Sequence, residues 1–102
     1  MNSIYLIQSL ENSYYKIGVS KHPQKRIKEH QTGNPSPTKL IEVYPSDLAY
    51  KIEKVLHRRY SYARKEGEWF ELSIAIEVSF KNECKKIEEN LVFIEKNGNV
   101  FI

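Results

Sequence analysis

The amino-acid sequence predicts one small α+β domain: a three-stranded antiparallel sheet flanked by helices, followed by a C-terminal helix and hairpin. Two runs rich in β-branched and aromatic residues, 4–7 and 14–19, are separated by a short polar break, which is typical of a β-hairpin. Apolar residues recur at helical spacing over residues 46–60 and again over residues 74–90. A chain of 102 residues suits one domain, and no linker divides it.

Proline, glycine and capping residues indicate the elements between these signals. Pro23 suits the first turn of a helix and Gly33 suits its end, so a helix is predicted between them. Residues 39–44 predict a third strand after a proline-rich break. Ser46 or Asp47 is then expected to cap the second helix.

The C-terminal third is expected to close the domain. Trp69 and Phe70 are interpreted as aromatic anchors in the core rather than as a platform for stacking bases. Beyond the last helix, residues 91–94 and 100–102 predict a terminal hairpin around the Asn-Gly pair at 97–98, which is the strongest hairpin signal in the chain.

Composition limits the class of protein. No apolar run approaches the length of a membrane span, and the N-terminus lacks the basic and then apolar pattern of a secretion signal. Cys84 is the only cysteine, so no intrachain disulfide can form, and a reducing, cytoplasmic setting is expected.

The net charge of +3 conceals an asymmetry along the chain. Residues 1–66 contain twelve Lys and Arg against six Asp and Glu, whereas residues 67–102 contain four against seven. A basic face attracts a phosphate backbone. The alternative is a solvated lysine-rich surface, which composition alone favours.

Four polar side chains of different chemistry are predicted to come together near the N-terminus. Cross-strand pairing in the first hairpin can place Tyr5 near Lys16. Arg26 and His30 lie four residues apart on the following helix, so they share a face. A phenol, an ammonium, a guanidinium and an imidazole from adjacent elements can handle a phosphodiester.

The second helix contributes a carboxylate at the edge of its apolar face. Glu53 borders the arc of apolar residues, and His57 follows one turn along on the same side. Neighbours at such a boundary can hold a carboxylate toward a cleft, as a metal ligand requires. The ordinary alternative is a boundary glutamate paired with Lys54, His57 or Arg26.

These segments resemble the GIY-YIG endonuclease superfamily. The first motif is present as residues 3–5, with serine in place of glycine, and the second as residues 16–18, with lysine in place of tyrosine. The spacing between the motifs and the offsets to Arg26 and His30 match the superfamily pattern.

Within the superfamily the chain is most similar to a small phage and bacterial branch, the T5orf172 or Mug113-like domain. The resemblance covers residues 3–72, which form the motif-bearing core, and leaves residues 73–102 to the C-terminal helix and hairpin. The matching residues outside the second motif are Tyr15, Val19, Ser20, Arg26, Thr32, Gly33, Glu53, His57, Glu68, Trp69 and Phe70.

The resemblance implies a role for each member of the candidate catalytic set. Glu53 would bind Mg²⁺ or Mn²⁺, and Arg26 would donate a forked pair of hydrogen bonds to the phosphate. Tyr5 would orient or deprotonate the attacking water, helped by Lys16, whose ammonium is expected to lower the phenol's pKa. His30 would hydrogen-bond Tyr5 or the phosphate.

Further residues are candidates for supporting roles. Tyr15 is expected to point to the core, yet it is the tyrosine nearest the second motif, so its role relative to Lys16 stays open. His57 is interpreted as a satisfied boundary histidine, and Glu68 either supports the site or anchors its loop. The residues expected to attract DNA are Lys21, Lys25, Lys28, Arg58 and Arg59.

The leading hypothesis is a Mg²⁺-dependent DNA endonuclease of GIY-YIG type. The alternative is a catalytically weak or inactive nuclease-like domain that binds DNA, which the replacements at Ser3 and Lys16 keep open. DNA is the expected partner and a membrane is not. The sequence contains no additional DNA-reading module, so a protein partner or an oligomer is an option for target recognition.

Overall fold

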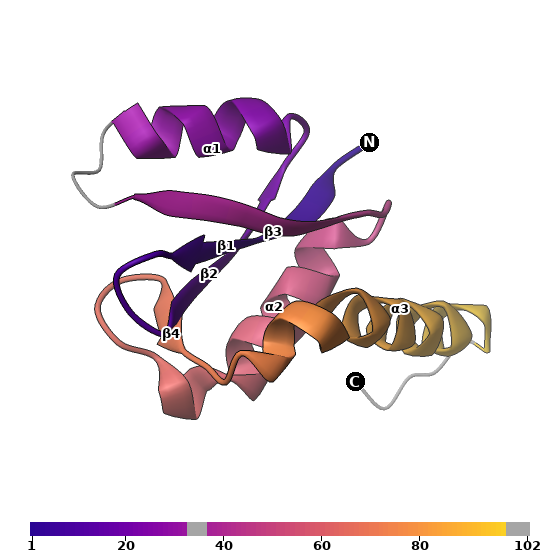
Figure 1. Cartoon of the computed structure of the whole chain (residues 1–102). Helices are drawn as coiled ribbons and strands as arrows, with labels where there is room; N and C mark the ends of the chain where they lie inside the picture. Colours follow the sequence, from indigo (N-terminus) through magenta and orange to yellow (C-terminus); the bar gives the residue numbers. More distant parts are fainter. Residues whose placement is uncertain (33–36, 98–102) are drawn as a thin grey trace.

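A computed structural model of the chain describes residues 1–32 and 37–97, with only the backbone described for residues 30–32. The sheet has four antiparallel strands in the order β3-β1-β2-β4. Helix α1 covers one face of it, and α2 and α3 lie on the other (Figure 1). In chain order the elements are β1 (Ser3–Ser9), β2 (Tyr14–Ser20), α1 (Pro23–Thr32), β3 (Thr38–Pro45), α2 (Ala49–Arg59), the 3₁₀ turn η1 (Ser61–Ala63), β4 (Trp69–Glu71) and α3 (Ala75–Lys96).

The first hairpin, the first helix and the third strand lie where the sequence predicts them. In the turn between β1 and β2, the Tyr14 amide donates a hydrogen bond of 2.9 Å to the Asn12 side-chain oxygen. Tyr5 pairs directly with Gly18, and Ile7 pairs with Lys16. Lys16 is therefore the diagonal neighbour of Tyr5 on the same face of the sheet.

The hydrophobic core lies between the sheet and the two helices α2 and α3, on what we call the inner face. Alternate residues of β1 and β2 point into it, and residues at helical spacing on α2 and α3 meet them. The most deeply buried members are Ile4, Leu6, Tyr15, Ile17, Ile52, Leu56, Phe70, Phe80 and Cys84.

The three-stranded prediction is wrong by one strand, because β4 adds to the edge of β2. This strand has only three residues, and its pairing with β2 joins segments more than fifty residues apart in sequence. Neighbouring residues of a strand point to opposite faces. Phe70 is accordingly fully buried in the core, whereas Trp69 is half-buried on the opposite, outer face, so only Phe70 is the predicted core anchor.

Helix α1 shields part of the outer face. Ile7 is fully buried and Tyr5 is 5 % exposed. Neither belongs to the core around α2 and α3, which their neighbours Ile4 and Leu6 join from the other face of β1. Pro23 at the start of α1 is buried, and the helix contacts β3, β1 and β2. The sheet is thus covered on both sides near β1 and left more open toward β4.

The predicted cap of α2 at Ser46 or Asp47 is wrong, because the helix begins at Ala49 and its N-cap residue is Leu48, which makes no side-chain capping bond. The Ser46 hydroxyl accepts a hydrogen bond of 3.0 Å from the Leu48 amide. Ser46 also donates to the Glu88 carboxylate of α3, and the Tyr44 hydroxyl donates to the same carboxylate at 2.7 Å. These bonds tie α3 to the segment that joins β3 to α2.

The predicted strand at residues 91–94 is wrong, because α3 continues to Lys96. Buried residues Phe80, Cys84 and Ile87 are followed at helical spacing by half-buried Leu91 and Ile94. This period outweighs the local preference of a short β-branched run. Asn97 ends the helix, and the rest of the predicted hairpin, residues 98–102, lies outside the described residues.

Among residues 1–32 and 37–97, no helix is long and apolar enough to cross a membrane. Cys84 is a free cysteine inside the core. Burial raises the pKa of its thiol to about 12, so the thiol stays protonated and unreactive.

Candidate active site

One pocket of about 400 Å³ on the outer face, which we call the Tyr5 pocket, is lined by four of the five predicted catalytic residues: Tyr5, Lys16, Arg26 and Glu53. The lining residues come from β1, β2, α1 and α2, and one of them, Glu68, comes from the loop before β4. Its lining residues are Tyr5, Lys16, Gly18, Val19, Arg26, Glu29, Glu53 and Glu68.

Gly18 makes room for the Tyr5 ring. A Cβ atom at this position would lie 2.3 Å from the Tyr5 hydroxyl oxygen and 2.5 Å from the ring carbon that bears it. The phenol therefore lies directly across the backbone of β2, and any larger residue at Gly18 would displace it. The second motif needs a glycine here for the position of Tyr5.

The electrostatic surroundings of Tyr5 differ from those expected. Burial raises the pKa of Tyr5, the Arg26 charge opposes the rise, and the Glu68 and Glu53 charges add to it. The expected lowering of this pKa by Lys16 is not found, because the Lys16 ammonium lies 3.4 Å from the Glu68 carboxylate and pairs with it. The Tyr5 phenol is protonated at neutral pH, so it can orient a water but does not deprotonate one unaided.

Glu53 is held at the pocket's edge with its side chain 26 % exposed. Burial raises the pKa of Glu53, the nearby His57 opposes the rise, and the Glu68 charge adds to it. The two neighbouring carboxylates of Glu53 and Glu68 therefore create a site where a positive charge is favoured.

His57 is a satisfied boundary histidine, as the sequence predicts, because its ring contacts the Ile17 carbonyl and the Phe70 ring. Its Nε2 atom lies 2.8 Å from the Ile17 carbonyl oxygen, and since that oxygen can only accept, Nε2 carries the proton. The ring also packs edge-on against Phe70, with 5.1 Å between ring centroids. The same Nε2 atom is 4.0 Å from a Glu53 oxygen, so His57 sits beside the carboxylate and limits where it can move.

The short length of β4 explains how a helix on the inner face reaches a pocket on the outer face. β4 pairs only with Tyr14, Tyr15 and Lys16 of β2. Beyond that point the edge of β2 is open, and there the Ile17 carbonyl meets His57 of α2. Glu53, one turn earlier on α2, enters the pocket through this opening.

The donor set of the Tyr5 pocket fits a small, hard cation. Glu53 and Glu68 offer carboxylate oxygens, and Tyr5 offers a phenolic oxygen. Among residues 1–32 and 37–97 there is no group of three or more His, Cys, Asp or Glu arranged to hold a metal. Mg²⁺ does not require one, because it commonly binds through one or two carboxylates and keeps several waters.

Some predicted residues lie elsewhere. Tyr15 points to the inner face, where its hydroxyl donates a hydrogen bond of 2.6 Å to Glu77, and burial together with this bond raises its pKa to about 12. The sequence leaves open whether Tyr15 or Lys16 takes the place of the second motif's tyrosine. In the structure only Lys16 lines the Tyr5 pocket. His30 belongs to α1, but its side chain lies outside the described part of the structure.

The basic residues predicted to attract DNA are exposed, and none of them lines the Tyr5 pocket. Lys21 precedes α1, and Lys25 and Lys28 lie on it, so two of these cations are on the helix that also carries Arg26 and the third is just before it. Arg58 is exposed on α2, whereas Arg59 forms an ion pair with Glu83 of α3. Arg59 therefore belongs to the packing of two helices.

The structure adds one acidic residue to the site, Glu29, and places the predicted supporting residue Glu68 in the wall of the same pocket. Glu29 lines the pocket three residues after Arg26, a spacing that places both on one face of α1 and could have indicated it. Glu68 lies in the pocket wall and is 62 % exposed, so its carboxylate has freedom to move. Its place depends on the pairing of β4, which no local pattern indicates.

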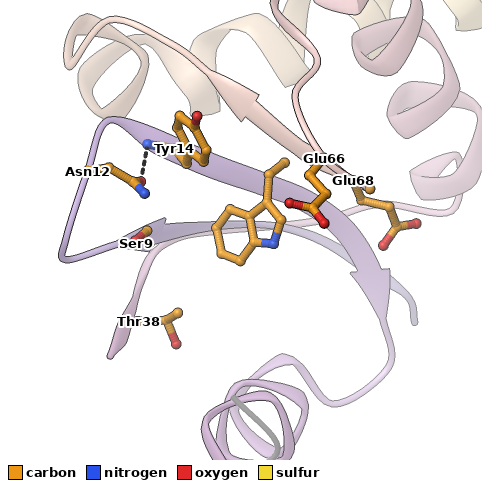
Figure 2. Close-up of a pocket in the computed structure, with 8 residues that line it drawn as sticks. Ser9, Asn12, Tyr14, Thr38, Glu66 and Glu68 are labelled. Carbon is orange, nitrogen blue, oxygen red and sulfur yellow. Dashed lines mark hydrogen bonds between the residues drawn. The ribbon is translucent and has the colours of Figure 1, made fainter. Parts of the chain in front are cut away.

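A second pocket of about 400 Å³ adjoins the first, and we call it the Trp69 pocket. Glu68 lines both pockets and separates them. Figure 2 shows Tyr14 and Asn12 on one side of it and Glu66 and Glu68 on the other. The full lining consists of Ser9, Asn12, Tyr14, Thr38, Glu66, Gly67, Glu68 and Trp69.

Comparison with known proteins places this geometry in context. Residues 2–92 match the T5orf172 domain, a family associated with nuclease-like and DNA-binding functions. A protein of Invertebrate iridescent virus 6 named "Putative KilA-N domain-containing protein 315L" is 28 % identical over 95 residues, covering 88 % of this chain. The chain spans only 40 % of that relative's length. No solved structure matches the chain.

Proposed function

Because the chain belongs to the T5orf172 family, we propose that it is a metal-dependent endonuclease that hydrolyses DNA phosphodiester bonds at the Tyr5 pocket. One observation carries the proposal. Tyr5, Arg26 and Glu53 are far apart in sequence and share no packing role, yet they line one pocket with the chemistry that phosphodiester hydrolysis needs. The same three residues match the pattern of the GIY-YIG enzymes that the chain resembles.

Arg26 is the group suited to bind the scissile phosphate. It is exposed on α1 and lines the pocket, so its guanidinium can turn toward a bound strand. A guanidinium donates two parallel hydrogen bonds to phosphate oxygens, and these strengthen as negative charge builds in the transition state. Lys21 just before α1, and Lys25 and Lys28 on this helix, add exposed positive charge that favours the approach of a phosphate backbone.

Tyr5 is suited to position the attacking water. Its hydroxyl is fixed over Gly18, and its raised pKa keeps it protonated at neutral pH. A neutral phenol both donates and accepts a hydrogen bond, so it can hold a water in line with the phosphorus. The nearby Arg26 charge stabilises any negative charge that develops on the phenol.

Glu53, with Glu68 beside it, would hold the divalent metal. A bound Mg²⁺ supplies charge neutralisation at the phosphate and the leaving oxygen. Glu53 is restrained by His57, whereas Glu68 is exposed and paired with Lys16. An exposed ion pair contributes little energy, so Glu68 can leave Lys16 at small cost when a cation or a phosphate enters the pocket.

The proposal is tested by Glu53→Gln in a plasmid-cleavage assay. Supercoiled plasmid is incubated with wild-type protein and Mg²⁺, with and without EDTA, and the variant is compared under the same conditions. The amide is close in size but is a poor Mg²⁺ ligand, so cleavage should fall by at least about a hundred-fold. DNA affinity should hold or increase, because a negative charge has left the pocket.

The matched control is Glu89→Gln, which removes the same charge from an exposed position on α3, away from the Tyr5 pocket. It should cut like the wild type. Full cleavage by Glu53→Gln would refute the metal site. A wild-type protein that binds plasmid and never cuts it would instead identify a nuclease-like domain that only binds DNA.

A further inference from the structure

The Trp69 pocket differs in chemistry from the Tyr5 pocket next to it. Lys16 and Arg26 line the Tyr5 pocket, whereas the described residues that line the Trp69 pocket include no Lys or Arg. Its charged members are Glu66 and Glu68. A phosphate is repelled by carboxylates, so the Trp69 pocket is unsuited to the backbone of a nucleic acid.

The walls of this pocket are aromatic and hydrogen-bonding. In the pairing of β2 with β4, Lys16 lies opposite Trp69 and Tyr14 lies opposite Glu71. Tyr14 and Trp69 are therefore diagonal neighbours on the outer face, within reach of one flat ligand. Both are half-buried, which leaves part of each ring accessible.

Polar groups surround the aromatic pair. Ser9 and Thr38 contribute hydroxyls, and Asn12 contributes an amide whose oxygen accepts from the Tyr14 backbone, which leaves its NH₂ group oriented by that bond. On the opposite side, Glu66 and Glu68 can accept hydrogen bonds from the N–H groups that an unpaired base exposes on its Watson–Crick edge (Figure 2). Aromatic faces with donors and acceptors at the rim suit a nucleobase.

The two pockets share Glu68, so a ligand can occupy both at once. We propose that the Trp69 pocket holds an unpaired nucleobase beside the scissile phosphate, so that the substrate is DNA with an extruded or unpaired base rather than a continuous duplex. This inference rests on the proposed function. Inside a duplex both faces of a base are already stacked, and only an unpaired base is available to enter the pocket.

Trp69 provides a direct reporter, because it is the only tryptophan in the chain. Its fluorescence is followed in EDTA, so that no DNA is cut, during titration with three short DNA duplexes. One carries a single unpaired thymine, the second carries an abasic site at that position, and the third is fully paired. The duplex with the unpaired thymine should quench the fluorescence and bind roughly ten-fold more tightly than the abasic duplex.

Variants separate stacking from folding. Trp69→Phe keeps an aromatic face and should retain most of the preference for the unpaired thymine, whereas Trp69→Ala and Tyr14→Ala should lose it. Tyr50→Ala is the matched control, because it removes an exposed tyrosine from α2 outside both pockets. Tyr14→Ala keeps the test valid if Trp69→Ala does not fold.

Equal affinity and equal quenching for the thymine and abasic duplexes would overturn the inference, as would loss of the preference in Tyr50→Ala alone. The outcome is independent of cleavage. If the protein discriminates the unpaired base in EDTA but never cuts in Mg²⁺, the nucleobase pocket is supported and the endonuclease function is refuted. If it cuts all three duplexes equally, the endonuclease function is supported and the nucleobase pocket is refuted.

Discussion

The inner face of the sheet is apolar and lies under two helices, whereas the outer face carries charged and aromatic side chains and is covered only in part by α1. Both faces are built from the same strands. On β2, Tyr15 and Ile17 point inward to the core, and Lys16 and Gly18 point outward to the Tyr5 pocket. One residue of displacement along a strand therefore separates a packing role from a proposed chemical one.

The tyrosines show what this difference means chemically. Tyr15 is enclosed in the core, and its hydroxyl is committed to Glu77. Tyr5 is nearly as buried, but its hydroxyl faces a pocket whose Arg26, Glu53 and Glu68 charges act on its pKa. Burial alone therefore does not separate the two tyrosines, and neither does a nearby carboxylate; what differs is that the Tyr5 hydroxyl faces a pocket that also contains the Arg26 cation.

The largest effect expected from this comparison is on stability, at the boundary between the faces. Phe70 is fully buried, packs against His57 and lies under the Arg64 guanidinium at 5.0 Å. Phe70→Ala should lower the free energy of unfolding by about 3–5 kcal/mol. Its neighbour Trp69 is half-buried on the outer face, so Trp69→Phe should cost far less. Urea unfolding of both variants measures the difference, and equal losses would contradict the division of the two faces.

The same division explains which elements the sequence could predict. The first hairpin and α1 follow from local signals: alternating apolar residues, Pro23 and Gly33. β4 could not be found in this way, because three residues pair with a strand distant in sequence and leave no local pattern. The strand predicted at residues 91–94 failed for the opposite reason, since a local preference was weighed above a helical period that extends through α3.

The candidate site was predictable only as far as motif spacing allowed. The resemblance to the GIY-YIG superfamily implies that Tyr5, Arg26 and Glu53 act together, and in the structure they line one pocket. The positions of Glu68 and Trp69 depend on the register of β4 against β2, so neither the shared wall nor the second pocket could be derived from the chain alone.

A smaller effect is expected where the outer face is most tightly packed. Gly18→Ala places a Cβ against the Tyr5 ring and should cost about 1–3 kcal/mol of stability. Cleavage should fall further than stability explains, because the phenol is displaced from its place over β2. Thermal melting and plasmid cleavage measure the two effects on the same sample.

A double variant isolates this contact. In Tyr5→Ala the ring that meets the new Cβ is gone, so Gly18→Ala should cost much less stability in that background than in the wild type. Additive costs would show that Gly18 is required for a reason other than the position of Tyr5.

The smallest effect concerns the pH dependence of stability and tests what Glu53 does when no metal is bound. Burial raises the pKa of Glu53 above its ordinary value of 4.5, so the folded state binds this proton more tightly than the unfolded state. Stability therefore falls as pH rises from 4.5 through the folded-state pKa, and the cost persists at neutral pH. Glu53→Gln removes the cost, so its Tm at neutral pH should equal or exceed that of the wild type by a few degrees, about the shift that 1 kcal/mol produces.

Well below pH 4.5 the carboxyl is protonated in both states, and the Tm difference between wild type and Glu53→Gln should vanish. Added Mg²⁺ should raise the Tm of the wild type and not that of the variant, because the ion binds only the folded carboxylate site. A variant that melts earlier than the wild type at neutral pH, with no response of either protein to Mg²⁺, would show that the charge of Glu53 serves an ion pair with His57. In that case Glu53 would belong with the packing residues of the inner face, despite its position at the Tyr5 pocket.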